Sequence, residues 1–233
     1  MARIAIIGAM KEEIENFITS YEIKKKIEWS SFVFYELTHN SHEVIIVKSG
    51  AGKVLAAMIT QKLIDIFSPD MILFTGVAGA LNAALDIGDI VISRDCIQHD
   101  LDVTALGFVR GTAGHSNHRE FIADRKLLKI ALSAKVEGHK IYAGRILTGD
   151  QFLTRKHIES QAYLIKELAG DAIEMEGSAV GQVCILNNLP FLIVRTISDK
   201  ADGSAPDDFG KFTPLAAKNS FLIVEHILKN IPK

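Results

Sequence analysis

The segment from Ala172 to Asp199 limits the fold more than any other part of the chain. Its residues predict a helix over 177–186, a turn, and a buried strand over 191–197. A helix followed by a strand of this length brings the two ends of the segment back towards each other. We therefore expect both ends to lie at one rim of a sheet, where open α/β proteins bind ligands.

Both ends of this segment are acidic although its middle is almost wholly apolar. Glu174 and Glu176 stand at the start and Asp199 at the close. A single acid at such a position is readily explained as a cap of a helix or strand. Three acids with Arg195 and Ser198 beside them favour a functional site, because unpaired charge next to an apolar strand is costly.

The rest of the chain alternates short apolar runs with segments of helical periodicity, which predicts an α/β protein. The run Arg3–Gly8 is rich in isoleucine, as is typical of a central strand buried on both faces. Further strands are expected at 71–75, 90–96 and 140–147, a hairpin over 31–48, and helices from about 11 and over 54–67, 124–135, 155–168 and 211–228. The predicted fold is a single domain, 1–233, a three-layer sandwich with a mixed central β-sheet flanked by helices.

Several connections contain the residues that a ligand site needs. Glycines at 50–52 and small residues at 76–80 would let a ligand approach the backbone, but neither stretch matches a phosphate-loop motif. Phe152, on a strand-to-helix loop, is explained equally well as a stacking surface or as a core aromatic. We expect Val109–Phe121 to be a surface loop or a partner-facing arm, and Lys200–Phe209 to be a flexible link that acts as a lid.

Composition excludes several classes of function. The chain has 26 Lys and Arg against 28 Asp and Glu, and no basic run exceeds Lys24–Lys26, so nucleic acid is not an expected partner. No apolar run approaches the roughly 20 residues of a membrane helix. We expect a cytoplasmic protein in which Cys96 and Cys184 stay reduced. Cys96 and His99 have a zinc-like spacing, but no second pair follows, so no metal is expected.

Eight short motifs follow one another along the chain in a fixed order. They are IIGAMKEEI, KSGAGKV, TGVAGAL, GDIVIS, HDLDVTALGF, GDQF, AIEMEGSAV and VRTISDKAD. In this order they resemble the purine nucleoside phosphorylase/hydrolase superfamily, and within it the 5'-methylthioadenosine/S-adenosylhomocysteine nucleosidases. The match runs from Arg3 to about Leu228. The resemblance implies hydrolysis of an adenine N-glycosidic bond without metal or organic cofactor, on a nucleoside phosphorylase-like fold.

The same resemblance implies roles for particular residues. Asp199 matches the acid that protonates a purine ring nitrogen, and Glu13 matches the residue that activates the attacking water. Glu176 matches the carboxylate that holds the ribose hydroxyls. The resemblance places Phe152 on adenine, the backbone of Leu153 at the edge of adenine, and Met175 on the sugar. It places Arg195 near the water and implies that Ser198 orients Asp199. The surrounding positions that it implies are Ile173, Glu174, Ala51, Ala78, Gly79 and Phe209.

Three positions depart from the family pattern. Val77 stands where many relatives carry serine, which removes a hydroxyl that helps hold the water, and Ala51 is smaller than the usual branched residue. Leu106 matches an aromatic that relatives supply from a partner subunit to the 5'-substituent pocket, which implies a homodimer.

Three alternatives stay open. A phosphorylase would need cations for phosphate, but no arginine lies between Arg3 and Arg94, and Lys11 has two acids beside it. A hydrolase of futalosine-type nucleosides is also compatible with the motifs. A non-catalytic nucleoside-binding relative would be expected to lack Glu13, Glu176 or Asp199.

Overall fold

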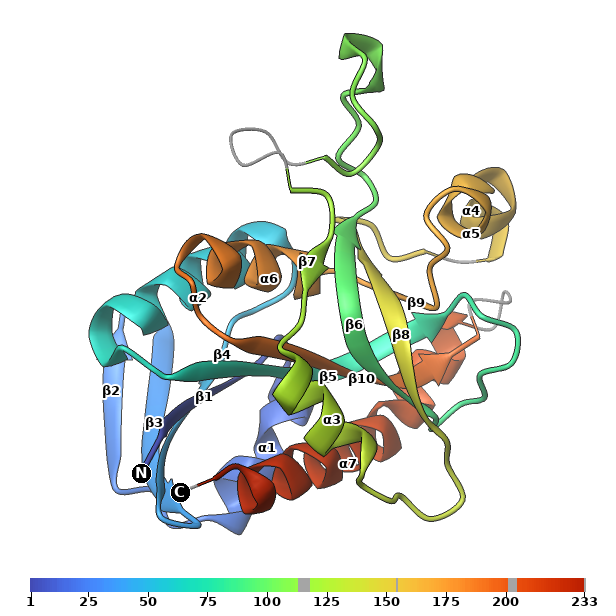
Figure 1. Ribbon diagram of the computed structural model, residues 1–233. Coiled ribbons are helices and arrows are strands. Elements are labelled where there is room, and N and C mark those ends of the chain that lie inside the picture. Colours follow the sequence, from blue (N-terminus) through green and yellow to red (C-terminus); the bar gives the residue numbers. More distant parts are fainter. Residues whose placement is uncertain (113–117, 154, 201–204, 233) are drawn as a thin grey trace.

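A computed structural model describes residues 1–112, 118–153, 155–200 and 205–232. Figure 1 shows a sheet with α2 and α6 on one side and α1, α3 and α7 on the other. The strands are β1 (Arg3–Gly8), β2 (Lys25–Trp29), β3 (Phe32–His39), β4 (His42–Lys48), β5 (Met71–Ala80), β6 (Ile90–Gln98), β7 (Phe121–Ile122), β8 (Ile141–Thr148), β9 (Ala172–Glu174) and β10 (Phe191–Asp199). The helices are α1 (Lys11–Ser20), α2 (Lys53–Phe67), α3 (Arg125–Leu132), α4 (Arg155–Ser160), α5 (Tyr163–Lys166), α6 (Gly177–Leu186) and α7 (Ala205–Asn230), with a 3-10 turn η1 (Thr104–Leu106).

The sheet is mixed, as the sequence predicts. β1 pairs in parallel with β4 and β5, and the hairpin partner β3 then adds antiparallel to β4. In the other half, the strands form a closed ring instead of an open sheet. Its successive pairings are β5–β10, β10–β6, β6–β8, β8–β9 and β9–β5. This ring brings the ends of strands that are distant in sequence to one place.

The buried strands confirm the interpretation of the apolar runs. Every residue of β10 is buried, and Ile4, Ile6 and Ile7 of β1 have no exposed surface. α7 packs across β10 and β5 on one face, while α2 packs against α6 on the other. A strand covered on both faces needs apolar residues throughout, which is why these runs lack alternation.

The sequence-based prediction of three strands was incomplete. β5 continues through the glycine-rich stretch to Ala80, because these small residues pair with β10 rather than form a loop. β9, only three residues long, is held between β5 and β8. β2 is an edge strand with exposed lysines, and only Ile27 and Trp29 of its five residues are apolar, so its apolar signal is weak.

Two expectations about helices were wrong. The helix expected over 155–168 is divided into α4 and α5, and Tyr163 at the start of α5 packs its ring under the guanidinium of Arg110, 4.2 Å away. The expected link after Asp199 is shorter than predicted, because α7 begins at Ala205. Pro206 suits the first turn of a helix, where its missing N–H costs nothing. The middle of that link, 201–204, lies outside the described residues.

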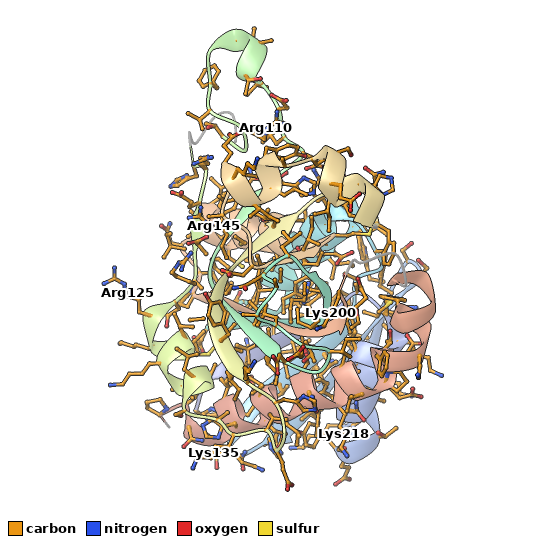
Figure 2. The ribbon with its side chains drawn as sticks, turned by 90° about the vertical axis from the view of Figure 1, so that its right-hand side faces the viewer. Arg110, Arg125, Lys135, Arg145, Lys200 and Lys218 are labelled. Carbon is orange, nitrogen blue, oxygen red and sulfur yellow. The ribbon has the colours of Figure 1, made fainter. Side chains whose placement is uncertain are left out.

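One segment projects from the body. Residues 100–111, called the arm from here on, carry η1 at their tip, and Figure 1 shows them standing clear of the sheet. Figure 2 shows Arg110 where the arm meets the body, and this residue pairs with Asp102 at 2.7 Å. The surface loop expected over 109–121 ends in β7, and its middle, 113–117, lies outside the described residues. Within the described part of the chain, no helix is long and apolar enough to cross a bilayer.

Candidate active site

A cavity of about 150 Å³ opens where the carboxyl ends of β1, β5, β8 and β10 meet. The described residues around it are Ala9, Met10, Glu13, Ala51, Val77, Ala78, Gly79, Gln151, Phe152, Leu153, Ile173, Glu174, Met175, Glu176, Ser198, Asp199 and Phe209. Four carboxylates therefore share one small cavity. Their different partners decide what each can do.

Glu13 is fixed by backbone amides. Its Oε2 accepts hydrogen bonds from the amides of Ala9, at 2.6 Å, and Met10, at 2.9 Å, and its Oε1 accepts from the amide of Val77 at 3.1 Å. Burial raises the pKa of Glu13 above its ordinary value, although the charge of Arg195 and the three amides act in the opposite direction. A carboxyl group with a raised pKa and a fixed orientation is suited to accept a proton from water.

The close approach of Glu13 to β5 depends on Gly76. A Cβ at this position would lie 2.5 Å from Oε1 of Glu13 and 2.9 Å from Nη1 of Arg195. These distances are shorter than van der Waals contact, so only glycine leaves room for both side chains. The glycine-rich sequence of β5 thus serves the site as well as the strand.

Glu174, in the cavity wall, forms a buried ion pair with Arg195, which lies behind it. Arg195, 1% exposed, places Nη2 2.6 Å from Oε2 of Glu174 and stacks its guanidinium 4.1 Å from the ring centre of Phe74. Glu174 also accepts hydrogen bonds from the Thr148 hydroxyl and from the amides of Glu176 and Gly177 at the start of α6. With this many donors, the Glu174 carboxylate is held in one orientation.

Glu176 is less well compensated. Its Oε1 accepts a hydrogen bond of 2.8 Å from the amide of Gly52, and its Oε2 lies 3.9 Å from Nη2 of Arg195. Burial, followed by repulsion from Glu174, raises the pKa of Glu176 to about 8, against the opposing effects of Arg195 and the Gly52 amide. This carboxyl group therefore holds a proton readily and can share it with a ligand hydroxyl.

Ser198 and Asp199 reach the same cavity because the strand is irregular. The register between β10 and β5 shifts between Ile197 and Asp199, and such a bulge lets two successive side chains face one side. The Ser198 hydroxyl donates a hydrogen bond of 3.0 Å to Oδ2 of Asp199. Both residues are buried, so the acid at the end of β10 is held in a set orientation.

The remaining walls are apolar and include two aromatic rings. Phe152, from the loop after β8, and Phe209, from the first turns of α7, meet edge to face with ring centres 5.5 Å apart. Phe152 remains 41% exposed, so it is not a core aromatic. Together the rings form a boundary suited to a flat apolar ligand.

The structure gathers nearly all the predicted site residues. Every one of them lines the cavity except Arg195, which lies behind Glu174, and Leu106, which is 76% exposed on the arm. The sequence-based prediction missed Ala9, Met10 and Gln151. Ala9 and Met10 directly follow the β1 run and Gln151 precedes Phe152, so position next to a strand end was the available signal.

Cys96 and His99 do not form the pair that zinc would need. The Cys96 thiol is buried against the carbonyls of Phe121 and Gly177, whereas Nδ1 of His99 lies 3.2 Å from the Tyr163 hydroxyl. Among the described residues, no three His, Cys, Asp or Glu side chains are arranged to hold a metal ion.

The chain belongs to the phosphorylase superfamily, whose family model matches residues 3–229. Within it, the chain is 36% identical over 231 residues to a 5'-methylthioadenosine/S-adenosylhomocysteine nucleosidase of Haemophilus influenzae (strain PittEE), covering 98% of this chain and 100% of the relative. The nucleosidase of Neisseria meningitidis, solved in complex with methylthio-immucillin-A, superimposes with a TM-score of 0.93 at 35% identity, covering 99% and 100% of the chains. A futalosine hydrolase of Helicobacter pylori strain 26695 has a TM-score of 0.92 at 30% identity, covering 99% and 98%. The resemblance noted from the motifs is confirmed.

Proposed function

We propose that this protein is an N-glycosidase that hydrolyses 5'-methylthioadenosine and S-adenosylhomocysteine, releasing adenine and the thio-substituted ribose. The observation that carries this proposal is that Glu13, Glu176 and Asp199 line one cavity whose other walls are aromatic and apolar. The similarity to nucleosidases over nearly the whole chain supports it.

The chemistry follows from two needs of the reaction. Adenine leaves poorly unless a ring nitrogen is protonated, and Asp199, oriented by Ser198, supplies that proton. Water then adds to the anomeric carbon as the bond to adenine breaks, and its proton passes to Glu13. Glu176 holds the ribose hydroxyls, and Phe152 with Phe209 encloses the purine.

Electrostatics favour hydrolysis over phosphorolysis. None of the described residues that line the cavity is a lysine or arginine, and the nearby Arg195 is already bound to Glu174. A phosphate dianion would meet Glu13 and Glu176 instead of the cations and amides that it needs. The acids that a non-catalytic relative would be expected to lose are all present.

The test is release of free adenine from 5'-methylthioadenosine by the purified protein, followed by chromatography with and without phosphate. We expect equal rates in both conditions and no sugar 1-phosphate. Aminofutalosine is included as a substrate because the fold is also that of a futalosine hydrolase. Adenine release that required phosphate would replace this proposal with a phosphorylase.

The two catalytic roles are separated by a substrate whose leaving group needs no proton, such as a nitrophenyl riboside. Asp199→Asn and Glu13→Gln should each lower turnover of 5'-methylthioadenosine by roughly 100-fold or more. The nitrophenyl riboside should restore Asp199→Asn far more than Glu13→Gln. Equal recovery of both variants, or of neither, would mean that the roles are assigned to the wrong residues.

We also infer a homodimer in which Leu106 of one subunit lies near the site of the other. Leu106 and its neighbours Phe108 and Val109 are exposed apolar residues on the arm, which is unusual for a surface that stays in water. The chain is proposed to act as one domain, and its two unpaired, buried cysteines support a cytoplasmic location.

A further inference from the structure

Three charged residues from separate motifs meet beside the cavity without lining it. Lys53 begins α2, Asp100 begins the arm, and Asp150 lies in the loop after β8. Nζ of Lys53 lies 2.6 Å from Oδ1 of Asp100 and 3.6 Å from Oδ2 of Asp150. Oδ2 of Asp100 accepts a hydrogen bond of 2.9 Å from the amide of Asp150. We refer to these three residues as the clasp.

The clasp is joined to the ribose-binding carboxylate through the start of α2. The amide of Lys53 donates a hydrogen bond of 2.9 Å to Oδ1 of Asp150, and the preceding amide, that of Gly52, donates to Oε1 of Glu176 at 2.8 Å. Two successive amides therefore hold two carboxylates, one in the clasp and one in the cavity. Any shift of α2 relative to Asp150 would also move the amide that Glu176 depends on.

The clasp is also joined to the aromatic wall. Gln151, Phe152 and Leu153 line the cavity directly after Asp150. Asp150 is held at two places: its backbone amide donates to Asp100, and its carboxylate accepts from the Lys53 amide. This arrangement sets the starting direction of the loop that presents Phe152.

Of the two ion pairs of the clasp, the one between Lys53 and Asp100 is stronger than an ordinary surface pair. The side chains of Lys53 and Asp100 are only 17% and 30% exposed, so water screens them weakly. Burial favours the neutral form of Asp100, but hydrogen bonds from Lys53 and the Asp150 amide outweigh it and lower the pKa of Asp100 below its ordinary value. Asp100 is therefore charged at neutral pH.

We propose that the clasp residues Lys53, Asp100 and Asp150 are positioning residues. They fix the positions of Glu176 and of the 151–153 loop, and thereby control affinity for the ribose and the purine of the nucleoside. This inference rests on the proposed function. The clasp touches neither the water-activating Glu13 nor Asp199 in the described contacts, so it acts on binding more than on bond cleavage.

The test compares Lys53→Met, Lys53→Arg and Asp100→Asn with the unchanged protein, using 5'-methylthioadenosine hydrolysis and inhibition by free adenine. We expect Lys53→Met and Asp100→Asn each to raise KM about tenfold or more, and to weaken adenine inhibition, while kcat changes less than about threefold. Lys53→Arg should recover most of the affinity. The double variant should be little worse than either single one, because both changes break the same contact.

Lys229→Met is the matched control, because Lys229 pairs with Glu225 at 3.0 Å near the end of α7, away from the cavity. It should leave KM and kcat unchanged. Lys53→Met and Asp100→Asn could instead lower the melting temperature and leave KM and adenine inhibition unchanged. That result would show that the clasp stabilises the fold and does not control affinity. If the unchanged protein released no adenine, the proposed function would fail, and adenine binding by calorimetry would still decide for or against the clasp.

Discussion

At the residue scale, the four carboxylates of the cavity are distinguished by their donors. Glu13 has three backbone amides, and Glu174 has an arginine, a hydroxyl and two amides. Asp199 has the Ser198 hydroxyl, whereas Glu176 has one amide and a more distant cation. Burial of Glu176 with so little compensation accounts for the rise of its pKa to about 8.

The raised pKa of Glu176 predicts how stability depends on pH. Below its ordinary pKa of 4.5 the carboxyl group is protonated in both the folded and unfolded chain, so its contribution to stability does not change with pH. Between 4.5 and about 8 the folded protein keeps a proton that the unfolded chain releases, so the free energy of unfolding falls as pH rises. Above about 8 both states are ionised and the loss, of the order of a few kcal/mol at most, is complete.

Glu176→Gln should remove this loss, so its melting temperature relative to the unchanged protein should rise by several degrees from about pH 5 to about pH 8.5. Glu22→Gln, at an exposed position, is the control and should show no such trend. Parallel melting curves for Glu176→Gln and the unchanged protein across this range would contradict the assignment.

At the element scale, β5 and β10 shape the cavity around Glu13 and Asp199, because the carboxyl-terminal halves of both strands depart from regular strand structure. β5 consists of small residues from Gly76 to Ala80, and β10 contains the bulge that turns Ser198 and Asp199 to one side. Glycine in a strand interior usually weakens it, so its presence marks a place where another group approaches closely. At Gly76 that group is Glu13.

Gly76→Ala should therefore displace the Glu13 carboxylate while leaving the fold in place, because the clash falls on side-chain atoms of Glu13 and Arg195 and not on backbone. Turnover should fall by roughly 100-fold, since a small misplacement of a catalytic group has that effect. Gly210→Ala is the control and should keep full activity, because no atom of the described residues outside its own stretch of α7 lies within 4 Å of the added Cβ. If Gly76→Ala kept more than about a third of turnover, the room left by this glycine would not matter to catalysis.

At the scale of the whole molecule, the arm carries apolar side chains that the rest of the same chain leaves exposed. It stands clear of the sheet in Figure 1 and carries Leu106, Phe108 and Val109, which are 76%, 49% and 55% exposed. Apolar side chains grouped on a projection gain the free energy of leaving water only when another surface covers them. A second copy of the chain is the partner that we propose.

Light scattering at micromolar concentration should therefore give the mass of a dimer, and Leu106→Asn should weaken the dimer and lower activity together. Leu222→Asn is the control, because Leu222 is 40% exposed on α7 rather than on the arm. A fully active monomer would remove the proposal that Leu106 serves the neighbouring site.

Local sequence patterns were enough to predict the order of most strands and helices and the acids at the strand ends. Burial on both faces requires apolar runs such as those of β1 and β10, and helices show their own period, so these signals are local. Glu13 and Asp199 could also be recognised locally, because each acid follows closely after such an apolar run. The resemblance of the motifs then supplied roles that pattern alone did not provide.

Sequence patterns did not predict which strands close the ring or which partner each acid has, because both depend on contacts between distant parts of the chain. β9 has too few residues for a pattern, and its place depends on β5 and β8. The amide of Gly52 meets Glu176 across 124 positions of sequence, and Lys53 meets Asp100 across 47. Such contacts leave no periodic trace because they depend on the packing of whole elements, and they set the pKa of Glu176 and the position of the cavity walls.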